Sequence, residues 1–166
     1  MLIMLGMIKL ENLIGDLLCA RGFKLATAES CTGGLIASRI TDVTGSSEYF
    51  LGGVAAYAYE AKVALLDVSW DTLKAHGAVS RETVLEMARG ARKVFNADIS
   101  ISVSGIAGPG GGLPDKPVGT VWVALVAPDS EWTRLFHFDG NRVQNKSSAA
   151  DAALQFLMDY LTGNIK

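Results

Sequence analysis

Apolar residues recur in several segments of this chain with the 3.6-residue period of an α-helix. From Leu10 to Leu18 they line one face of a helix of about four turns, and Arg21-Gly22 ends this run. The same period predicts further helices over residues 35–40, 60–66, 70–74, 80–95 and 142–161.

The pattern also identifies the inward faces of the two longest helices. Ser80 is a suitable N-cap for the first of them. Its apolar face comprises Val84, Met87, Ala88, Ala91, Val94 and Phe95. In the last helix, the positions expected to point inward are Ala149, Ala153, Leu154, Leu157 and Met158.

Shorter runs, either alternating or continuously apolar, predict β-strands over residues 23–28, 53–57, 98–103, 118–127 and 131–138. The run 118–127 is nearly all apolar, as expected for a strand that is covered on both faces. The run 131–138 alternates, which favours a place near an edge of the sheet. Three residues, 128–130, separate these two strands, a spacing that indicates an antiparallel pair. Residues 45–47 and 104–112 are predicted loops.

Interleaved helices and strands are typical of a layered α/β domain, here with a mixed sheet. The 166 residues fit one domain, 1–166, with no repeat or linker. With 49% hydrophobic and 19% charged residues, an ordinary globular fold is expected. The net charge of −2 has no basic surplus, which argues against a nucleic-acid partner. Two cysteines and two histidines are too few for a disulfide framework or a metal cluster.

The N-terminal stretch Met1–Ile8 is apolar, but no cation precedes it and no small-residue cleavage site follows. It is also too short to span a bilayer. We therefore expect a cytoplasmic protein without a membrane partner. Met4 and Met7 are alternative starts, and the first six residues are expected to be loosely held.

The stretch Ala28–Gly34 (Ala-Glu-Ser-Cys-Thr-Gly-Gly) connects a predicted strand to a predicted helix. The first N–H groups of a helix lack intrahelical partners, so this point suits an anion or a developing oxyanion. Ser30 alone is equally consistent with a plain N-cap. The dense cluster of small and polar residues around it favours a functional site. Cys31 is the rival nucleophile, because a thiol at a helix N-terminus has a lowered pKa.

Other candidate residues also have two interpretations each. Lys62 is either a solvated helical lysine or a partly desolvated base. Tyr57 either orients a substrate or belongs to the core. Arg142 stands at a helix start, where the dipole disfavours a cation, which favours a ligand-binding role. Glu29 is a candidate general acid or base without an evident partner carboxylate. His76 and His137 are more consistent with structural roles.

The run from Ser104 to Gly112 is rich in glycine and offers backbone N–H groups to a ligand. It lacks the Gly-Lys-Ser/Thr ending of a Walker A loop, and it does not match the dinucleotide-binding fingerprint. No nucleotide cofactor is therefore indicated. Lys116 brings a cation to the start of the strand that follows.

Taken together, these motifs resemble the C-terminal domain of the competence/damage-inducible protein CinA, a family that includes stand-alone nicotinamide-nucleotide amidohydrolases. The larger members carry an additional N-terminal domain. The matching stretches follow the order of the family and cover nearly the whole chain. They are Ala28–Gly34, Gly45–Ser47, Tyr57 with Glu60–Lys62, His76–Ser80, Ser102–Pro109 and Lys116–Val121.

The resemblance implies a three-layer α/β/α sandwich without metal or cofactor, assembled as a homodimer or a larger homo-oligomer. It implies hydrolysis of the carboxamide of nicotinamide mononucleotide to nicotinate mononucleotide and ammonia. By motif match, Ser30 is the nucleophile, Lys62 the base that takes its proton, and Tyr57 a further catalytic residue. The residues implied in substrate binding are Thr32, Gly33, Ser47, Ser104, Gly105, Gly108, Thr120 and Arg142.

This chain departs from the family at Tyr59, where asparagine is frequent. A bulkier tyrosine is expected to narrow the pocket or to change its substrate. Two alternatives to the nucleotide amidohydrolase remain. One is a non-catalytic domain that binds a nucleotide or a partner. The other is an amidase for a different nucleotide-like amide.

Overall fold

A central five-stranded sheet organises the computed structural model, which describes residues 9–165; the predicted loosely held start lies outside them. Its strands lie in the order β2-β1-β3-β4-β5. Their bounds are β1 Leu25–Glu29, β2 Phe50–Ala55, β3 Ile99–Gly105, β4 Thr120–Val126 and β5 Glu131–His137. β1 runs parallel to both β2 and β3, whereas β4 is antiparallel to both β3 and β5. The mixed sheet and the antiparallel last pair are thus confirmed.

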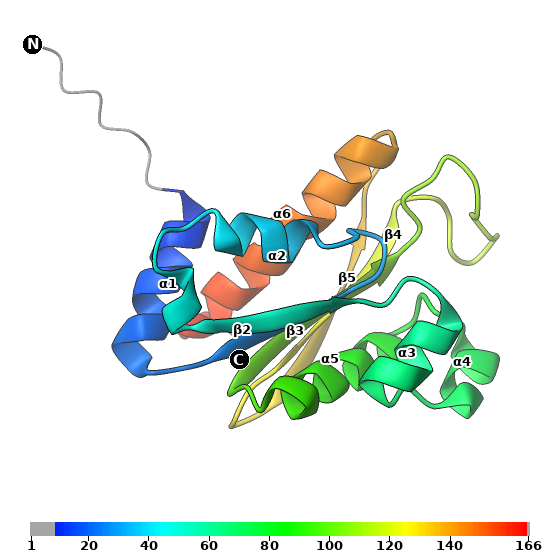
Figure 1. Ribbon diagram of the computed structural model, residues 1–166. Helices are drawn as coiled ribbons and strands as arrows, with labels where there is room; N and C mark the ends of the chain where they lie inside the picture. The colour runs from blue at the N-terminus through cyan, green and yellow to red at the C-terminus, as the bar shows by residue number, and fades with distance from the viewer. Residues whose placement is uncertain (1–8, 166) are drawn as a thin grey trace, which may run out of the picture.

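Helices cover both faces of this sheet (Figure 1). One layer consists of α1 (Leu10–Arg21), α2 (Leu35–Thr41) and α6 (Arg142–Leu161), which contact one another. The other consists of α3 (Tyr59–Leu66), α4 (Trp70–His76) and α5 (Arg81–Phe95), with α5 packed on β1, β3 and β4. The predicted three-layer α/β/α architecture is therefore confirmed. None of the helices in the described part of the chain is long and apolar enough to cross a bilayer.

Most predicted elements lie within a few residues of their observed bounds, and the differences have local causes. β2 begins at Phe50 rather than at residue 53, because its pairing with β1 starts at Leu25. Residues Ser46–Glu48 form a short 3-10 helix, η1, where a loop was expected. β3 continues to Gly105, opposite Val121 of β4.

Two positions on the predicted apolar helix faces are wrong. Leu13 of α1 is 38% exposed. Val94 of α5 is 57% exposed. The neighbouring Phe95 provides the inward side chain of this last turn and packs against the core beneath α3 to α5. The rest of the predicted face of α5 is buried: Val84, Met87, Ala88 and Ala91.

The turn from β1 into α2 is built around two glycines and one buried carboxylate. Gly33 and Gly34 have φ of 65° and 99°, a region that L side chains rarely adopt. They bring the start of α2 back over the end of β1. There Glu29, 1% exposed, accepts hydrogen bonds from the backbone N–H groups of Gly34, Ile36 and Ala37 at 2.8–3.1 Å. Glu29 thereby satisfies the N-terminus of α2 in place of a cap residue.

Glu29→Gln tests this cap. Glu29 accepts through both oxygens: Oε2 from Gly34 and Ile36, and Oε1 from Ala37. Glutamine has a single acceptor oxygen and turns its NH₂ group toward the other N–H donors, so at least one of the three bonds is lost. We expect the free energy of unfolding to fall by about 1–3 kcal/mol in urea titrations. The control is Glu60→Gln, an exposed carboxylate without a hydrogen-bond partner among the described residues. Equal stability of the two variants would contradict the cap.

A second constraint on the fold is the close approach of α3 to α5. A Cβ atom added at Gly90 of α5 would lie 2.0 Å from the Leu66 carbonyl oxygen of α3. Gly90→Ala is therefore expected to destabilise the protein by about 1–3 kcal/mol, although alanine is the better helix former. In the control Gly110→Ala, the added Cβ meets no atom within 4 Å. Thermal unfolding of both variants measures the difference; a stabilised Gly90→Ala protein would show that the contact relaxes freely.

Candidate active site

The candidate site lies where the parallel strands β1, β2 and β3 end. The chain leaves β1 over one face of the sheet, through α2, and leaves β2 over the other, through α3 to α5 (Figure 1). Ligand crevices in open α/β sheets form at such a switch point, outside the carboxyl ends of the strands. Ser30 follows β1 and donates its backbone N–H to Val103 of β3 at 3.0 Å. The first candidate residue is thus placed directly at the crevice.

A cavity of about 260 Å³ occupies this crevice. It is lined from five segments that are distant in the sequence. These are Ser30 and Cys31, Tyr57, Ala78 and Val79, the loop residues Ser104–Gly108 with Gly110 and Gly111, and Arg142. Of the predicted site residues, Ser30, Tyr57, Ser104, Gly105, Gly108 and Arg142 therefore share one cavity.

Lys62 lies directly behind Ser30. Its side chain is fully buried, and its ammonium nitrogen Nζ is 3.0 Å from Ser30 Oγ. Nζ also donates to the carbonyl oxygens of Ala56 at 2.8 Å and Tyr57 at 3.2 Å. Burial lowers the pKa of Lys62 to about 8. The predicted partly desolvated lysine is therefore observed, not the solvated one.

These contacts determine what Lys62 offers to Ser30 in each protonation state. The carbonyl oxygens of Ala56 and Tyr57 only accept, so each takes one N–H of Lys62. The neutral amine has two N–H groups and one lone pair. With both N–H groups engaged, the lone pair points at the Ser30 hydroxyl. Neutral Lys62 is thus oriented to accept the proton of Ser30.

Cys31, the rival nucleophile, is in a different environment. Its thiol is 5% exposed, and burial, reinforced by the nearby Glu29 carboxylate, raises the pKa of Cys31 to about 12. The thiolate is the nucleophilic form of cysteine. The expected lowering of the thiol pKa by the helix N-terminus is therefore wrong, and the geometry favours Ser30.

The start of α2 does not supply the expected free N–H groups. Glu29 occupies those of Gly34, Ile36 and Ala37, which also means that Glu29 is a structural cap and does not line the cavity. In the turn between Ser30 and α2, the backbone N–H groups of Cys31 and Thr32 donate to no backbone carbonyl within residues 9–165, and both lie near the Cys31 sulfur. This turn is therefore the candidate source of donors beside Ser30.

Arg142 and Tyr57 form the rim of the cavity. The Arg142 guanidinium donates to Tyr57 Oη at 2.9 Å and to the Gly108 carbonyl at 2.8 Å. The Tyr57 side chain is 63% exposed, so it is not a core residue. Arg142 therefore holds a cation at the mouth of the cavity, as its unfavourable place at the start of α6 suggested.

The remaining predicted site residues do not line this cavity in the single chain. Thr32 is buried and donates to Glu29 at 2.6 Å, and Gly33 shapes the adjoining turn. Thr120 donates to the Pro117 carbonyl at the start of β4. Ser47 is exposed on η1, before β2. Because β1 and β2 are parallel, Ser47 lies at the amino ends of these strands, whereas Ser30 lies at their carboxyl ends.

Tyr59 does not narrow the cavity, because its side chain is not part of the lining. His76, 3.7 Å from Glu82, and His137, next to Thr120, also lie outside it.

Sequence reasoning missed two features of the wall. Ala78 and Val79, between α4 and α5, were quoted as part of a motif but not as lining residues. Asn145 of α6, 1% exposed, donates to the Ala107 carbonyl at 3.1 Å and accepts from the Gly140 N–H. It holds the glycine-rich loop against α6. The capping box of Asn141 and Gln144 fixes this first turn and is the sequence signal that points to it.

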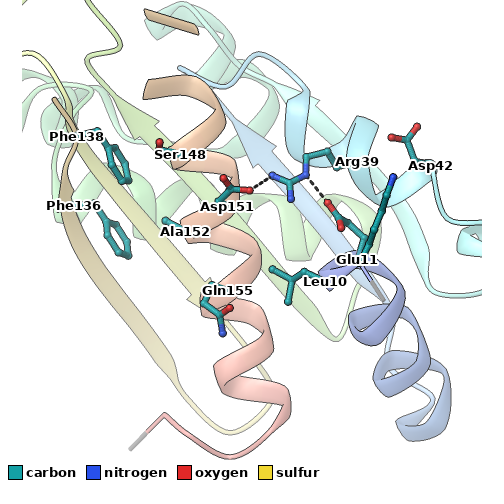
Figure 2. A pocket seen from close by; sticks show the side chains of 11 residues that line it. Leu10, Glu11, Arg39, Asp42, Phe136, Phe138, Ser148, Asp151, Ala152 and Gln155 are labelled. Atoms are coloured by element: carbon teal, nitrogen blue, oxygen red, sulfur yellow. Dashed lines mark hydrogen bonds and ion pairs between the residues drawn. The ribbon is translucent and has the colours of Figure 1, made fainter. Parts of the chain in front are cut away.

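A second, larger hollow of about 800 Å³ lies over α6, between β5 and the ends of α1 and α2 (Figure 2). Arg39 is its central charge, bound to Glu11 at 2.5 Å and Asp151 at 2.6 Å (Figure 2). This cation is already compensated, and none of the predicted site residues lines the hollow. Among residues 9–165, no group of three or more His, Cys, Asp or Glu is placed to hold a metal ion.

Known proteins match this chain over nearly its whole length. Residues 7–161 match the CinA C-terminal domain. Two CinA-like proteins, from Desulfotalea psychrophila and Thermotoga maritima, are each 47% identical to this chain. The matches cover 94% and 93% of this chain but only 38% of the length of each relative.

Solved structures share the fold. The competence/damage inducible protein CihA from Agrobacterium tumefaciens is 39% identical, with a TM-score of 0.89 over 92% of this chain and 93% of its own. A CinA superfamily protein from Escherichia coli is 35% identical, with a TM-score of 0.87 over 92% and 90%. The resemblance that the six stretches indicated is therefore confirmed, and the chain belongs to the CinA C-terminal domain family.

Proposed function

We propose that this protein hydrolyses the carboxamide of nicotinamide mononucleotide to nicotinate mononucleotide and ammonia. The observation that carries the proposal is the buried contact of 3.0 Å between Lys62 Nζ and Ser30 Oγ. A serine–lysine pair of this kind forms an acyl-enzyme from an amide. The substrate itself is the one that the family resemblance implies.

In the proposed reaction, neutral Lys62 takes the Ser30 proton as Oγ attacks the carboxamide carbon. The tetrahedral intermediate places its oxyanion near the N–H groups of Cys31 and Thr32. The C–N bond then breaks, and the leaving nitrogen takes the proton from Lys62, so that ammonia departs. Water, deprotonated by the same lysine, then attacks the acyl carbon. The bond from this carbon to Ser30 Oγ breaks, Oγ takes the proton back from Lys62, and nicotinate mononucleotide is released.

Arg142 is the proposed partner of the substrate phosphate. Its guanidinium stands at the mouth of the cavity, at the N-terminus of α6, where an anion is also favoured by the helix dipole. Binding energy from the phosphate would distinguish the nucleotide from free nicotinamide. The family resemblance also implies Thr120 as a candidate for holding the phosphate, but its hydroxyl donates to the Pro117 carbonyl and has no place in the proposed contact.

Ser30→Ala should lower kcat for ammonia release from nicotinamide mononucleotide by at least about 10³-fold, because the nucleophile is lost. Ser147→Ala, an exposed serine on α6, is the matched control. Cys31→Ala should retain turnover. Full activity of Ser30→Ala together with an inactive Cys31→Ala protein would move the nucleophile to Cys31. A native protein that binds the nucleotide without turnover would indicate a binding domain.

The pH dependence should report the ionisation of Lys62. The base must be neutral, and its pKa is lowered to about 8. We therefore expect kcat/KM to rise about tenfold per pH unit below this value and to level off above it. Steady-state rates between about pH 6 and 9 test this expectation. A flat profile over that range, with chemistry rate-limiting, would contradict Lys62 as the base.

Arg142→Ala should raise KM for nicotinamide mononucleotide about 10- to 100-fold, since a charged hydrogen bond to the phosphate is lost. Hydrolysis of nicotinamide riboside, which lacks the phosphate, should change far less. Arg81→Ala is the matched control, because Arg81 is also the first residue of a helix but does not line the cavity. An equal loss with both substrates would contradict the phosphate role.

A further inference from the structure

The α4–α5 connection forms one wall of the cavity, and two side chains hold its backbone. The N–H of Ala78 donates to Tyr59 Oη at 3.2 Å. The carbonyl of the same residue accepts from Ser104 Oγ at 2.7 Å. Tyr59 is the first residue of α3, the helix that also carries Lys62, and Ser104 lies near the end of β3. The backbone of Ala78 thus links α3, which carries the proposed base Lys62, to Ser104 in the cavity lining.

The bond to Ala78 decides which way the Ser104 hydroxyl faces. Ser104 is 1% exposed and lines the cavity. A hydroxyl has one proton and two acceptor lone pairs, whereas a carbonyl oxygen only accepts. The proton of Ser104 is therefore committed to Ala78. Toward a ligand in the cavity, the hydroxyl offers lone pairs alone.

The same orientation recurs along β3. Ser100 donates to the Ala88 carbonyl at 2.6 Å, and Ser102 donates to the Val84 carbonyl at 2.5 Å, both on α5. Alternate residues of a strand point to one face, so Ser104 continues this row. Only at Ser104 does the row reach the cavity. In Ser100 and Ser102 this hydrogen bond only joins β3 to α5. In Ser104 the corresponding bond also leaves the hydroxyl with acceptor lone pairs alone toward a ligand.

We propose that Ser104 selects a carboxamide over a carboxylate at the reacting group of the ligand, and that Tyr59 is the positioning residue that holds Ala78 for this purpose. The inference rests on the proposed function. A carboxamide NH₂ group donates to the Ser104 lone pair. A carboxylate presents only acceptors, so its oxygens repel that lone pair. The site would thus retain the amide substrate and release the acid product.

Tyr59 allows a selective test, because its ring and its hydroxyl have separate contacts. The side chain is 40% exposed, and its ring packs at a tilt against Trp70 with a centroid distance of 6.5 Å. Tyr59→Phe keeps this packing and removes only the acceptor of the Ala78 N–H. The matched control is Tyr160→Phe, whose hydroxyl donates to Asp129 at 2.9 Å outside the cavity lining.

The experiment uses the Ser30→Ala protein, which binds without turnover, and titrates it with nicotinamide mononucleotide and nicotinate mononucleotide by calorimetry. The parent should prefer the amide. Adding Ser104→Ala should lower the ratio of amide to acid affinity about tenfold. Adding Tyr59→Phe should lower the same ratio about threefold, and Tyr160→Phe should leave it unchanged.

Each outcome has a distinct meaning. A ratio unchanged by Ser104→Ala would overturn the selection while leaving the proposed function intact. Equal weakening of both nucleotides by Tyr59→Phe would show a merely structural role for Tyr59. If Ser104→Ala does not fold, Tyr59→Phe decides the proposal, since an exposed side chain is changed. A parent that binds neither nucleotide, with no turnover by the native protein, would overturn the proposed function as well.

Discussion

A lysine side chain closed off from water is the constraint on which the candidate site depends. Lys62 needs acceptors for its N–H groups because burial of an unsatisfied amine is costly. The chain supplies them from the two residues that follow β2, Ala56 and Tyr57, and leaves one direction, toward Ser30. The end of β2, the start of α3 and the end of β1 are therefore held together by one nitrogen atom. The same carbonyl contacts that satisfy the buried Lys62 nitrogen also direct it at Ser30.

Polar groups already used within the fold decide what remains for a ligand. Glu29 takes the N–H groups of Gly34, Ile36 and Ala37 at the start of α2, so these donors are not available to a ligand. Ser104 gives its proton to Ala78 and keeps its lone pairs. Arg142 is bound at the rim to Tyr57 and Gly108, and it forms no ion pair within residues 9–165. Structural hydrogen bonds thus set the donor or acceptor character of each wall.

Much of the fold could be predicted because the period of apolar residues directly reflects burial. α6 was placed at its observed bounds, and the hairpin spacing correctly indicated antiparallel β4 and β5. The early start of β2 could not be inferred, since Gly52 and Gly53 weaken the local strand signal and only pairing with β1 holds them extended. The exposure of Val94 depends likewise on which neighbour meets the core.

For the site, the sequence by itself determined the residue types and the elements that carry them: a serine after β1, a lysine on the helix after β2, a glycine-rich loop after β3 and an arginine at the start of the last helix. Only the tertiary structure decided which of them meet. It brought Lys62 into contact with Ser30 and turned the Glu29 carboxylate toward the N–H groups at the start of α2. It also put Ser47 at the opposite ends of the parallel strands from Ser30. Such contacts link residues distant in the chain, and their donors and acceptors are assigned only when every neighbour is in place.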